Sequence, residues 1–259
     1  MVYYAIAITI VAALYESIIN IIGLSTLVIF TAITYIYFHF PQLNKVVRIC
    51  LFIAISVCFA CFAFHKVPGF FNIIAIDKLQ LSKVSIPFSM YLNFDKVMPA
   101  LIIYVIGNLH ISEKQKISED IKYTALSLLI CIIIVVILTL ITGYALFEPK
   151  IPSILPIWAI NNFFFICFSE EVFFRGFLQR TLQNLLLKRR ILAVIITALI
   201  FGLTHFQGGI VYIALSTICG FFYGYAYYKT NKILCSMIVH FGLNLSHLLL
   251  FTYPALIVK

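Results

Sequence analysis

Residues 155–178 read LPIWAINNFFFICFSEEVFFRGFL, an apolar run that contains two adjacent acids, Glu170 and Glu171, followed by Arg175. Placing one ionised side chain at the centre of a lipid bilayer costs about 2.5–3.5 kcal/mol on insertion scales. These charges therefore need partners, and ionisable groups at such depth usually mark a functional site. A structural ion pair that joins one helix to its neighbours is the simpler alternative.

The composition of the whole chain is that of an integral membrane protein. Of its 259 residues, 63% are hydrophobic and 10% are charged, and the mean hydropathy is +1.10. A soluble domain carries charge at about a quarter of its positions. The net charge of +9 does not predict a nucleic-acid partner, because no basic face with interleaved aromatic residues is present. The basic residues lie in short breaks between apolar runs, where they set orientation and contact membrane lipids.

The cysteines do not indicate a metal or redox centre. Cys58 and Cys61 form a single C-x-x-C, without the second pair that a zinc site of this type needs. All seven lie within apolar runs, and we interpret them as small apolar residues: Cys50, Cys58, Cys61, Cys131, Cys167, Cys219 and Cys235. We expect no cofactor.

The apolar runs predict an all-α, polytopic transmembrane helical bundle of about eight or nine spans, since a span needs about 20 mostly apolar residues. The first run is too long for one helix, and Glu16, Asn20 and Gly23 mark its break. The expected spans are two within 2–40, then 46–64, 99–109, 123–146, 154–182, 191–206, 210–228 and 233–251. We expect the segment 66–96 to be a loop, with or without a surface helix, and 112–122 to be an exposed charged loop.

Few polar residues lie deep in the last five expected spans: Glu170, Glu171, Arg175, His205, His240, Asn244 and His247. Residues four apart share one helical face, so Glu171 can pair with Arg175. By the same spacing His240 and Asn244 point the same way. Glu170 is rotated about 100° from Glu171. We therefore expect Glu171 to be neutralised and structural, and Glu170 to face a cavity.

This set of side chains suits peptide hydrolysis. A buried carboxylate near a histidine can take a proton from water and return one to a leaving amine. An imidazole N–H and an asparagine amide can stabilise the oxyanion of a tetrahedral intermediate. Glu170 with His205 would form the base, and His240 with Asn244 the donor pair. Each histidine taken alone is more typical of a satisfied core residue than of a catalyst, but three helices that each place polar groups in lipid favour a functional site.

Three short spaced motifs in this part of the chain resemble the three motifs of the CPBP family. They are Glu170-Glu171-x-x-x-Arg175, Phe201-x-x-x-His205 and His240-x-x-x-Asn244. That family contains the type II CAAX prenyl endopeptidases and the bacterial Abi and bacteriocin-processing homologues. All three motifs are complete, in the expected order, and the resemblance covers about residues 123–251.

The resemblance implies an intramembrane glutamic endopeptidase whose water is activated by Glu170 and His205. It implies that His240 and Asn244 hold the oxyanion. Glu171 and Arg175 match positions that support activity, and His247 lies outside the motifs, so we interpret it as packing. The implied partner is a peptide or protein at the membrane, with or without a lipid modification.

The resemblance also divides the chain. Residues 1–122 would form a variable N-terminal membrane region, 123–251 the catalytic core and 252–259 a short tail. Compact loops and early spans favour a bacterial inner membrane.

Two alternatives stay open at the level of sequence. Glu170, His205 and His240 have the composition of a two-histidine, one-carboxylate metal site, which would make the protein a metal-dependent membrane protease. No H-E-x-x-H motif is present. The second alternative is a non-catalytic immunity or scaffold protein that keeps the same residues as structural ion pairs.

Overall fold

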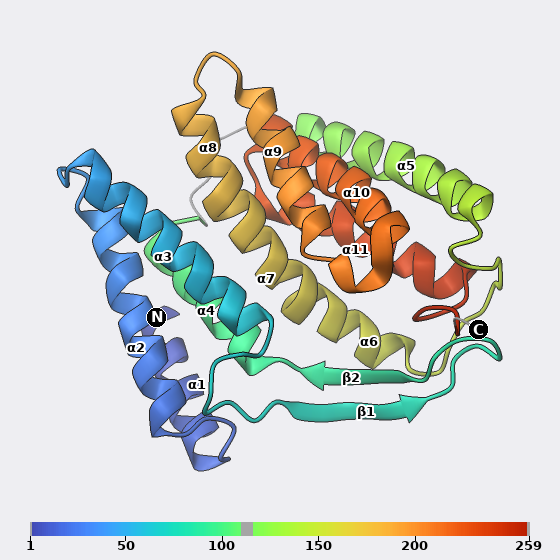
Figure 1. Cartoon of the computed structure of the whole chain (residues 1–259), viewed down its shortest axis with the longest axis horizontal. Helices are drawn as coiled ribbons and strands as arrows, with labels where there is room; N and C mark the ends of the chain where they lie inside the picture. Colours follow the sequence, from blue (N-terminus) through green and yellow to red (C-terminus); the bar gives the residue numbers. More distant parts are fainter. Residues whose placement is uncertain (1, 110–115, 258–259) are drawn as a thin grey trace. The chain divides into compact units, whose positions relative to one another are not determined.

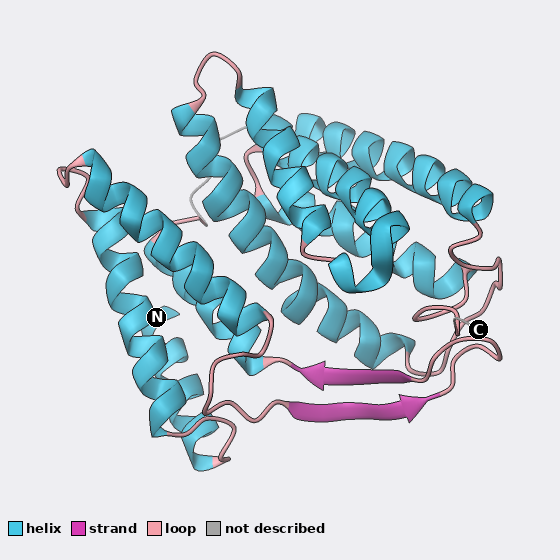
Figure 2. Ribbon diagram, viewed as in Figure 1, coloured by secondary structure: helices cyan, strands magenta, loops and turns pink. Residues whose placement is uncertain are grey.

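The computed structural model describes residues 2–109 and 116–257, and within these ranges it is helical apart from loops and one two-stranded sheet (Figures 1 and 2). The chain forms two compact units. The first comprises Met1–Ala75 and Tyr91–Ile111, and the second comprises Ile76–Met90 and Ser112–Lys259. The second unit contains every residue that the sequence singles out for chemistry.

The first unit is built from four helices: α1 (Val2–Tyr15), α2 (Ile21–His39), α3 (Lys45–Ala63) and α4 (Phe94–Ile106). The expected break in the first apolar run is confirmed. The Asn20 side chain accepts hydrogen bonds from the backbone N–H groups of Ile22, at 2.9 Å, and Gly23, at 3.2 Å. It thereby caps the N-terminus of α2, where backbone donors have no partner within the helix. Helices α2, α3 and α4 pack against one another.

Two expectations for the segment 66–109 are wrong. In place of a loop, β1 (Ile73–Leu79) pairs with β2 (Phe88–Leu92) as a two-stranded sheet. β1 begins with the short apolar run IIAI, whose β-branched residues favour a strand. Helix α4 begins five residues earlier than the expected span at 99 and has only 13 residues, which is too short to cross a bilayer unaided.

Besides parts of β1 and β2, the second unit contains α5 (Ile117–Thr142) and then one long composite helix. Its consecutive parts are α6 (Leu155–Asn161), η1 (Asn162–Cys167), α7 (Phe168–Glu171), η2 (Val172–Gln179) and α8 (Arg180–Leu185). The remaining helices are α9 (Arg190–Leu203), the short η3 (Phe206–Gly208), α10 (Gly209–Thr230) and α11 (Ile233–Leu250). Helix α10 packs against α9, α5 and α11, and the composite helix runs beside this group (Figure 1).

The all-α polytopic bundle is confirmed. Six helical stretches among the described residues are long and apolar enough to cross a membrane, namely Ile21–His39, Lys45–Ala63, Ile117–Thr142, Leu155–Leu185, Phe206–Thr230 and Ile233–Leu250. Ile6–Tyr15 and Arg190–Leu203 are shorter apolar helices. The eight or nine spans expected from the sequence are thus an approximate count.

The start of α5 differs from the expected exposed loop at 112–122. Residues 112–115 lie outside the described part of the chain, but α5 already begins at Ile117. Asp120 is buried in its first turn and forms an ion pair with Lys232, at the start of α11. This pair joins the N-terminal ends of two long helices.

The helix that carries the two acids changes its winding around them. The α-helical turn α7 lies between two π-helical stretches, η1 and η2. A π-helical stretch has a wider turn than an α-helix, and such stretches inside α-helices are frequent at functional sites. The change of winding redirects the side chains that follow the acids, so a uniform 100° per residue does not describe this segment.

Glycines on α9 and α10 let the helices of the second unit approach closely. A Cβ atom on Gly220 would lie 2.9 Å from Cδ1 of Phe201, and one on Gly224 would lie 2.6 Å from Oε1 of Gln179. On α9, a Cβ atom on Gly202 would collide with the Thr217 hydroxyl and lie 2.8 Å from the Ile213 carbonyl oxygen. These small residues allow backbone contact within the chain, as small-x-x-x-small pairs do.

We expect Gly202→Ala to lower the free energy of unfolding by about 1–3 kcal/mol, because the added methyl group meets backbone atoms of α10 that cannot move aside. The matched control is Gly242→Ala, whose methyl group would meet the flexible side chain of Leu128. Thermal unfolding in detergent compares the two variants. Equal melting temperatures for both would contradict the close α9–α10 packing.

Candidate active site

The centre of the site is the carboxylate of Glu171, which has no exposed surface. Its Oε1 atom lies 3.2 Å from Nη1 of Arg175 and 2.8 Å from Nδ1 of His240. Its Oε2 atom accepts a hydrogen bond from the Ser236 hydroxyl. Charge-assisted hydrogen bonds of this kind compensate the loss of hydration that burial imposes. The expected Glu171–Arg175 pair is therefore present, and it extends to two residues of α11.

Arg175 is fully buried, and its surroundings explain how a guanidinium can be tolerated there. Besides the contact with Glu171, Nη2 donates to the Gly220 carbonyl oxygen at 2.8 Å. The guanidinium carbon also lies 4.9 Å from the ring centroid of Phe201 and 5.4 Å from that of Tyr223, within the range of cation–π attraction. One turn further on, Gln179 donates to the carbonyl oxygen of Gly224 at 2.9 Å. The Arg175–Gly220 and Gln179–Gly224 hydrogen bonds together hold η2 against α10.

Glu170 has different surroundings from its neighbour. Its side chain keeps 14% of its surface exposed, whereas that of Glu171 is completely buried. Its Oε2 atom lies 3.9 Å from Nε2 of His240. This distance is too long for a direct hydrogen bond but suits a bridging water or substrate oxygen. The imidazole of His240 thus lies between the two carboxylates, with one nitrogen toward each.

His240 is held in place by its own contacts. Because the Glu171 carboxylate accepts a hydrogen bond from Nδ1 of His240, that nitrogen carries a proton. Nε2 is therefore the nitrogen that faces Glu170. The ring stacks on Tyr223, with centroids 4.4 Å apart and planes inclined by 16°. The imidazole therefore has little freedom to turn away from Glu170.

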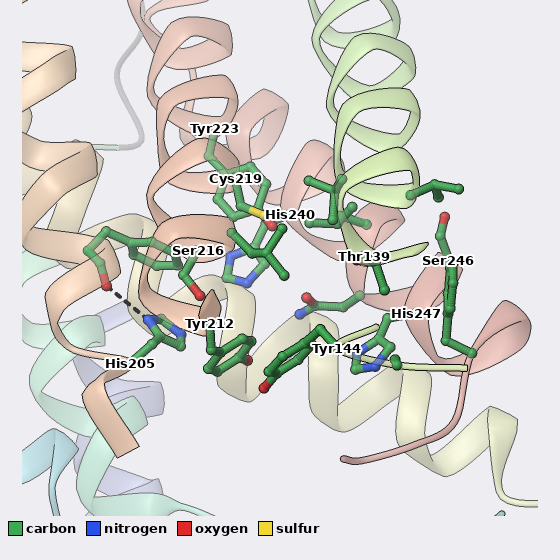
Figure 3. Close-up of a pocket in the computed structure, with 18 residues that line it drawn as sticks. Thr139, Tyr144, His205, Tyr212, Ser216, Cys219, Tyr223, His240, Ser246 and His247 are labelled. Atoms are coloured by element: carbon green, nitrogen blue, oxygen red, sulfur yellow. Dashed lines mark hydrogen bonds between the residues drawn. The ribbon is translucent and has the colours of Figure 1, made fainter. Parts of the chain in front are cut away.

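His205 is not part of a helix. Helix α9 ends at Leu203, and His205 lies in the turn before η3, half-buried. Its Nδ1 atom donates to the carbonyl oxygen of Phe201 at 2.9 Å, which is the dashed line in Figure 3. This bond assigns the proton to Nδ1 and leaves a lone pair on Nε2, the form that can accept a proton from water.

Asn244 lies one turn after His240 on α11. Its Nδ2 atom donates to Oδ1 of Asn162 at 3.2 Å, and it lies 3.9 Å from Sγ of Cys167. Cys167 itself donates to the same Asn162 oxygen at 3.3 Å. Two residues of η1 thus orient the Asn244 amide, and Cys167 contributes a hydrogen bond in addition to apolar volume.

A cavity of about 90 Å³ is lined by three of the predicted residues, His205, His240 and Asn244. Figure 3 shows the two histidines at this cavity. Glu170 is not among its lining residues, so the expectation that Glu170 faces a cavity is not confirmed here. The cavity wall also contains polar residues that the motifs do not include: Thr139, Tyr144, Tyr212, Ser216, Ser246 and His247. His247 therefore lines the cavity as well as packing against Tyr253, with ring centroids 5.2 Å apart. Its spacing of seven residues from His240 already placed it on the same face of the helix.

The described residues contain no group of three or more His, Cys, Asp or Glu side chains that could hold a metal ion. Glu170, His205 and His240 consequently do not form the three-ligand arrangement of the metal alternative. In both His205 and His240, Nδ1 donates to a protein acceptor, so Nε2 is the ring nitrogen that is left for other partners.

A comparison with protein families identifies the region that contains these residues. The family described as type II CAAX prenyl endopeptidase Rce1-like matches residues 152–246, which include all three motifs. The resemblance to the CPBP family is thereby confirmed for this region. The match indicates a membrane protease, a hydrolase that acts on a membrane-associated peptide substrate. No curated protein and no solved structure matches the chain.

The two adjacent acids should differ in their contribution to stability. We expect Glu171→Gln to lower the free energy of unfolding by about 3–5 kcal/mol, because it leaves the buried guanidinium of Arg175 without a counter-charge. Glu170→Gln, at a partly exposed site, should cost about 1 kcal/mol or less. Denaturant or thermal unfolding in detergent measures both.

A double variant tests the cause of this difference. Replacing Glu171 by Gln together with Arg175 by Met removes both charges of the pair, so part of the lost stability should return. Equal losses for the two single glutamate variants, or a double variant as unstable as the sum of its parts, would show that the ion pair does not carry the effect.

Proposed function

We propose that this chain, which matches the type II CAAX prenyl endopeptidase Rce1-like family over residues 152–246, is an intramembrane endopeptidase of the glutamic type. The observation that carries the proposal is the contact of His240 with two carboxylates of different exposure. Glu171 holds the imidazole through Nδ1 at 2.8 Å, while the Glu170 carboxylate lies 3.9 Å from Nε2 and retains contact with solvent. A structural ion pair would not need the second, partly exposed acid.

In this proposal the reaction begins with a water molecule near Glu170. The Glu170 carboxylate takes a proton from the water as general base, while Nε2 of His205 accepts a hydrogen bond from it and orients it. The oxygen of the water forms a bond to the carbonyl carbon of the substrate. The carbonyl π electrons move to its oxygen, which gives a tetrahedral intermediate.

The negative oxygen of the intermediate needs donors in a site from which water is excluded. In this proposal the imidazole of His240 is doubly protonated, so that Nε2–H donates to the oxyanion while Nδ1–H donates to Glu171. Asn244 supplies the Nδ2–H that Asn162 does not engage, which gives up its long contact with Sγ of Cys167 at 3.9 Å. The proton held by Glu170 then passes to the nitrogen of the leaving amine, and the C–N bond breaks. Glu170 returns to its ionised form.

The wider assignments follow from the same residues. We propose residues 123–251 as the catalytic core, since every residue of this mechanism lies within them. The substrate would be a peptide or protein at the membrane, with or without a lipid modification. Compact loops between the apolar helices favour the bacterial inner membrane as the location.

Glu170→Gln should abolish peptide cleavage while the protein stays folded and membrane-inserted, because an amide cannot take a proton from water. We expect the rate to fall by at least about 100-fold. The purified protein in liposomes is incubated with membrane proteins from cells that produce the Glu170→Gln variant, in which uncleaved substrate accumulates. New peptide N-termini are identified by mass spectrometry.

The matched control is Glu16→Gln, which removes an exposed carboxylate outside the second unit. This variant should generate the same new N-termini as the unaltered protein. Identical cleavage by the Glu170→Gln protein would contradict Glu170 as the general base. No cleavage by any form, together with an unchanged phenotype of Glu170→Gln cells, would favour the non-catalytic alternative.

Removal of metal ions should leave the proteolytic rate unchanged, because a carboxylate and an imidazole activate the water in this mechanism. Purified protein is dialysed against 1,10-phenanthroline and assayed as above. A loss of activity that zinc restores would instead support the metal-dependent alternative.

A further inference from the structure

The imidazole of His205 needs more than its hydrogen bond to hold a fixed direction. The residue lies in a turn after α9, and its bond from Nδ1 to the Phe201 carbonyl oxygen constrains one point of the ring. Rotation about this bond would redirect Nε2. Two aromatic rings limit that rotation.

Phe201 and Tyr212 enclose the His205 ring. The centroid of Phe201 lies 4.8 Å from that of the imidazole, and the centroid of Tyr212 lies 5.4 Å from it. The planes of Tyr212 and His205 are inclined by 83°, the edge-to-face geometry that aromatic pairs prefer. Tyr212 belongs to the first turn of α10 and is not part of any of the three motifs.

Tyr212 is itself fixed from two sides. Tyr144, from the loop after α5, stacks parallel to it with centroids 5.4 Å apart and planes inclined by 5° (Figure 3). Gly208 lies against the Cβ, Cγ and Cδ1 atoms of Tyr212, and a Cβ atom on Gly208 would be 2.7 Å from Cγ of the tyrosine. The next residue, Gly209, has a φ angle of +80°, which favours glycine. The Gly208–Gly209 turn thus leaves room for the tyrosine ring.

We propose that Tyr212 is a positioning residue, whose ring, supported by Tyr144, holds the His205 imidazole with Nε2 directed at the catalytic water. The catalytic consequence rests on the proposed function, while the geometric part can be tested without turnover. The ring and not the hydroxyl group carries this role, so Tyr212→Phe should preserve it and Tyr212→Leu should remove it.

Chemical labelling tests the geometry directly. The purified full-length protein in detergent is treated with diethyl pyrocarbonate, and the modification of each histidine is followed by mass spectrometry relative to the exposed His39. In Tyr212→Leu the His205 rate should rise about 2- to 10-fold, the range that corresponds to loss of one aromatic contact. Tyr212→Phe should match the unaltered protein. The matched control is Tyr228→Leu, at the far end of α10.

A second variant and an internal standard guard against unfolding. Tyr144→Leu leaves Tyr212 in place but removes its support, so it should raise His205 labelling by a smaller factor. His240 is only 4% exposed, and its slow labelling reports an intact fold in each variant. Unchanged His205 labelling in both leucine variants, with His240 still protected, would overturn the proposal.

Kinetics then connect the geometry to the reaction. Tyr212→Leu should lower kcat and kcat/KM by the same factor, about 10-fold, because the lost interaction orients a group in the transition state. Tyr212→Phe should retain both values. A Tyr212→Phe protein that is inactive while His205 labelling is normal would make the hydroxyl group catalytic and refute a positioning role. Absence of cleavage by the unaltered protein would refute the proposed function alone, since labelling still decides the geometry.

Discussion

The constraint on which the second unit depends is the charge of one fully buried carboxylate. An ionised group without partners in such surroundings costs several kcal/mol, so Glu171 must collect its donors from the chain around it. It receives Arg175 from its own helix and Ser236 with His240 from α11. Arg175 in turn holds the Gly220 carbonyl group of α10. Three long helices therefore meet at one charge.

This arrangement separates two tasks that neighbouring acids could otherwise share. The buried acid, Glu171, stabilises the fold and aligns His240 through its bond to Nδ1. The partly exposed acid, Glu170, keeps contact with solvent and faces Nε2 of the same His240 ring. The π-helical stretches η1 and η2 on either side of the acids adjust the winding so that Asn162 and Cys167 reach Asn244, while Arg175 and Gln179 reach α10.

Much of this could be predicted from the sequence because it depends on spacing. The four-residue interval predicted the Glu171–Arg175 pair, and the polar residues around Asn20 predicted the break before α2. Other features have no such signal. A π-helical turn leaves the apolar pattern unchanged, and Ser236 in an apolar run is indistinguishable from a neutral packing residue. The strand β1 was missed because its apolar run is short, and Tyr212 because an aromatic residue near a helix start is common in membrane proteins.

The unequal burial of the two acids also bears on how this scaffold can diverge. Glu171 bonds to Arg175, Ser236 and His240 where the helices meet, whereas Glu170 lies beside this point and keeps 14% of its side chain exposed. Under the proposed mechanism, a single codon change at position 170 would therefore stop the reaction without dismantling the architecture. Pseudoenzymes should arise readily from such a chain and persist as binding proteins, and a search that scores the double-acid motif as one unit would not separate them from active relatives.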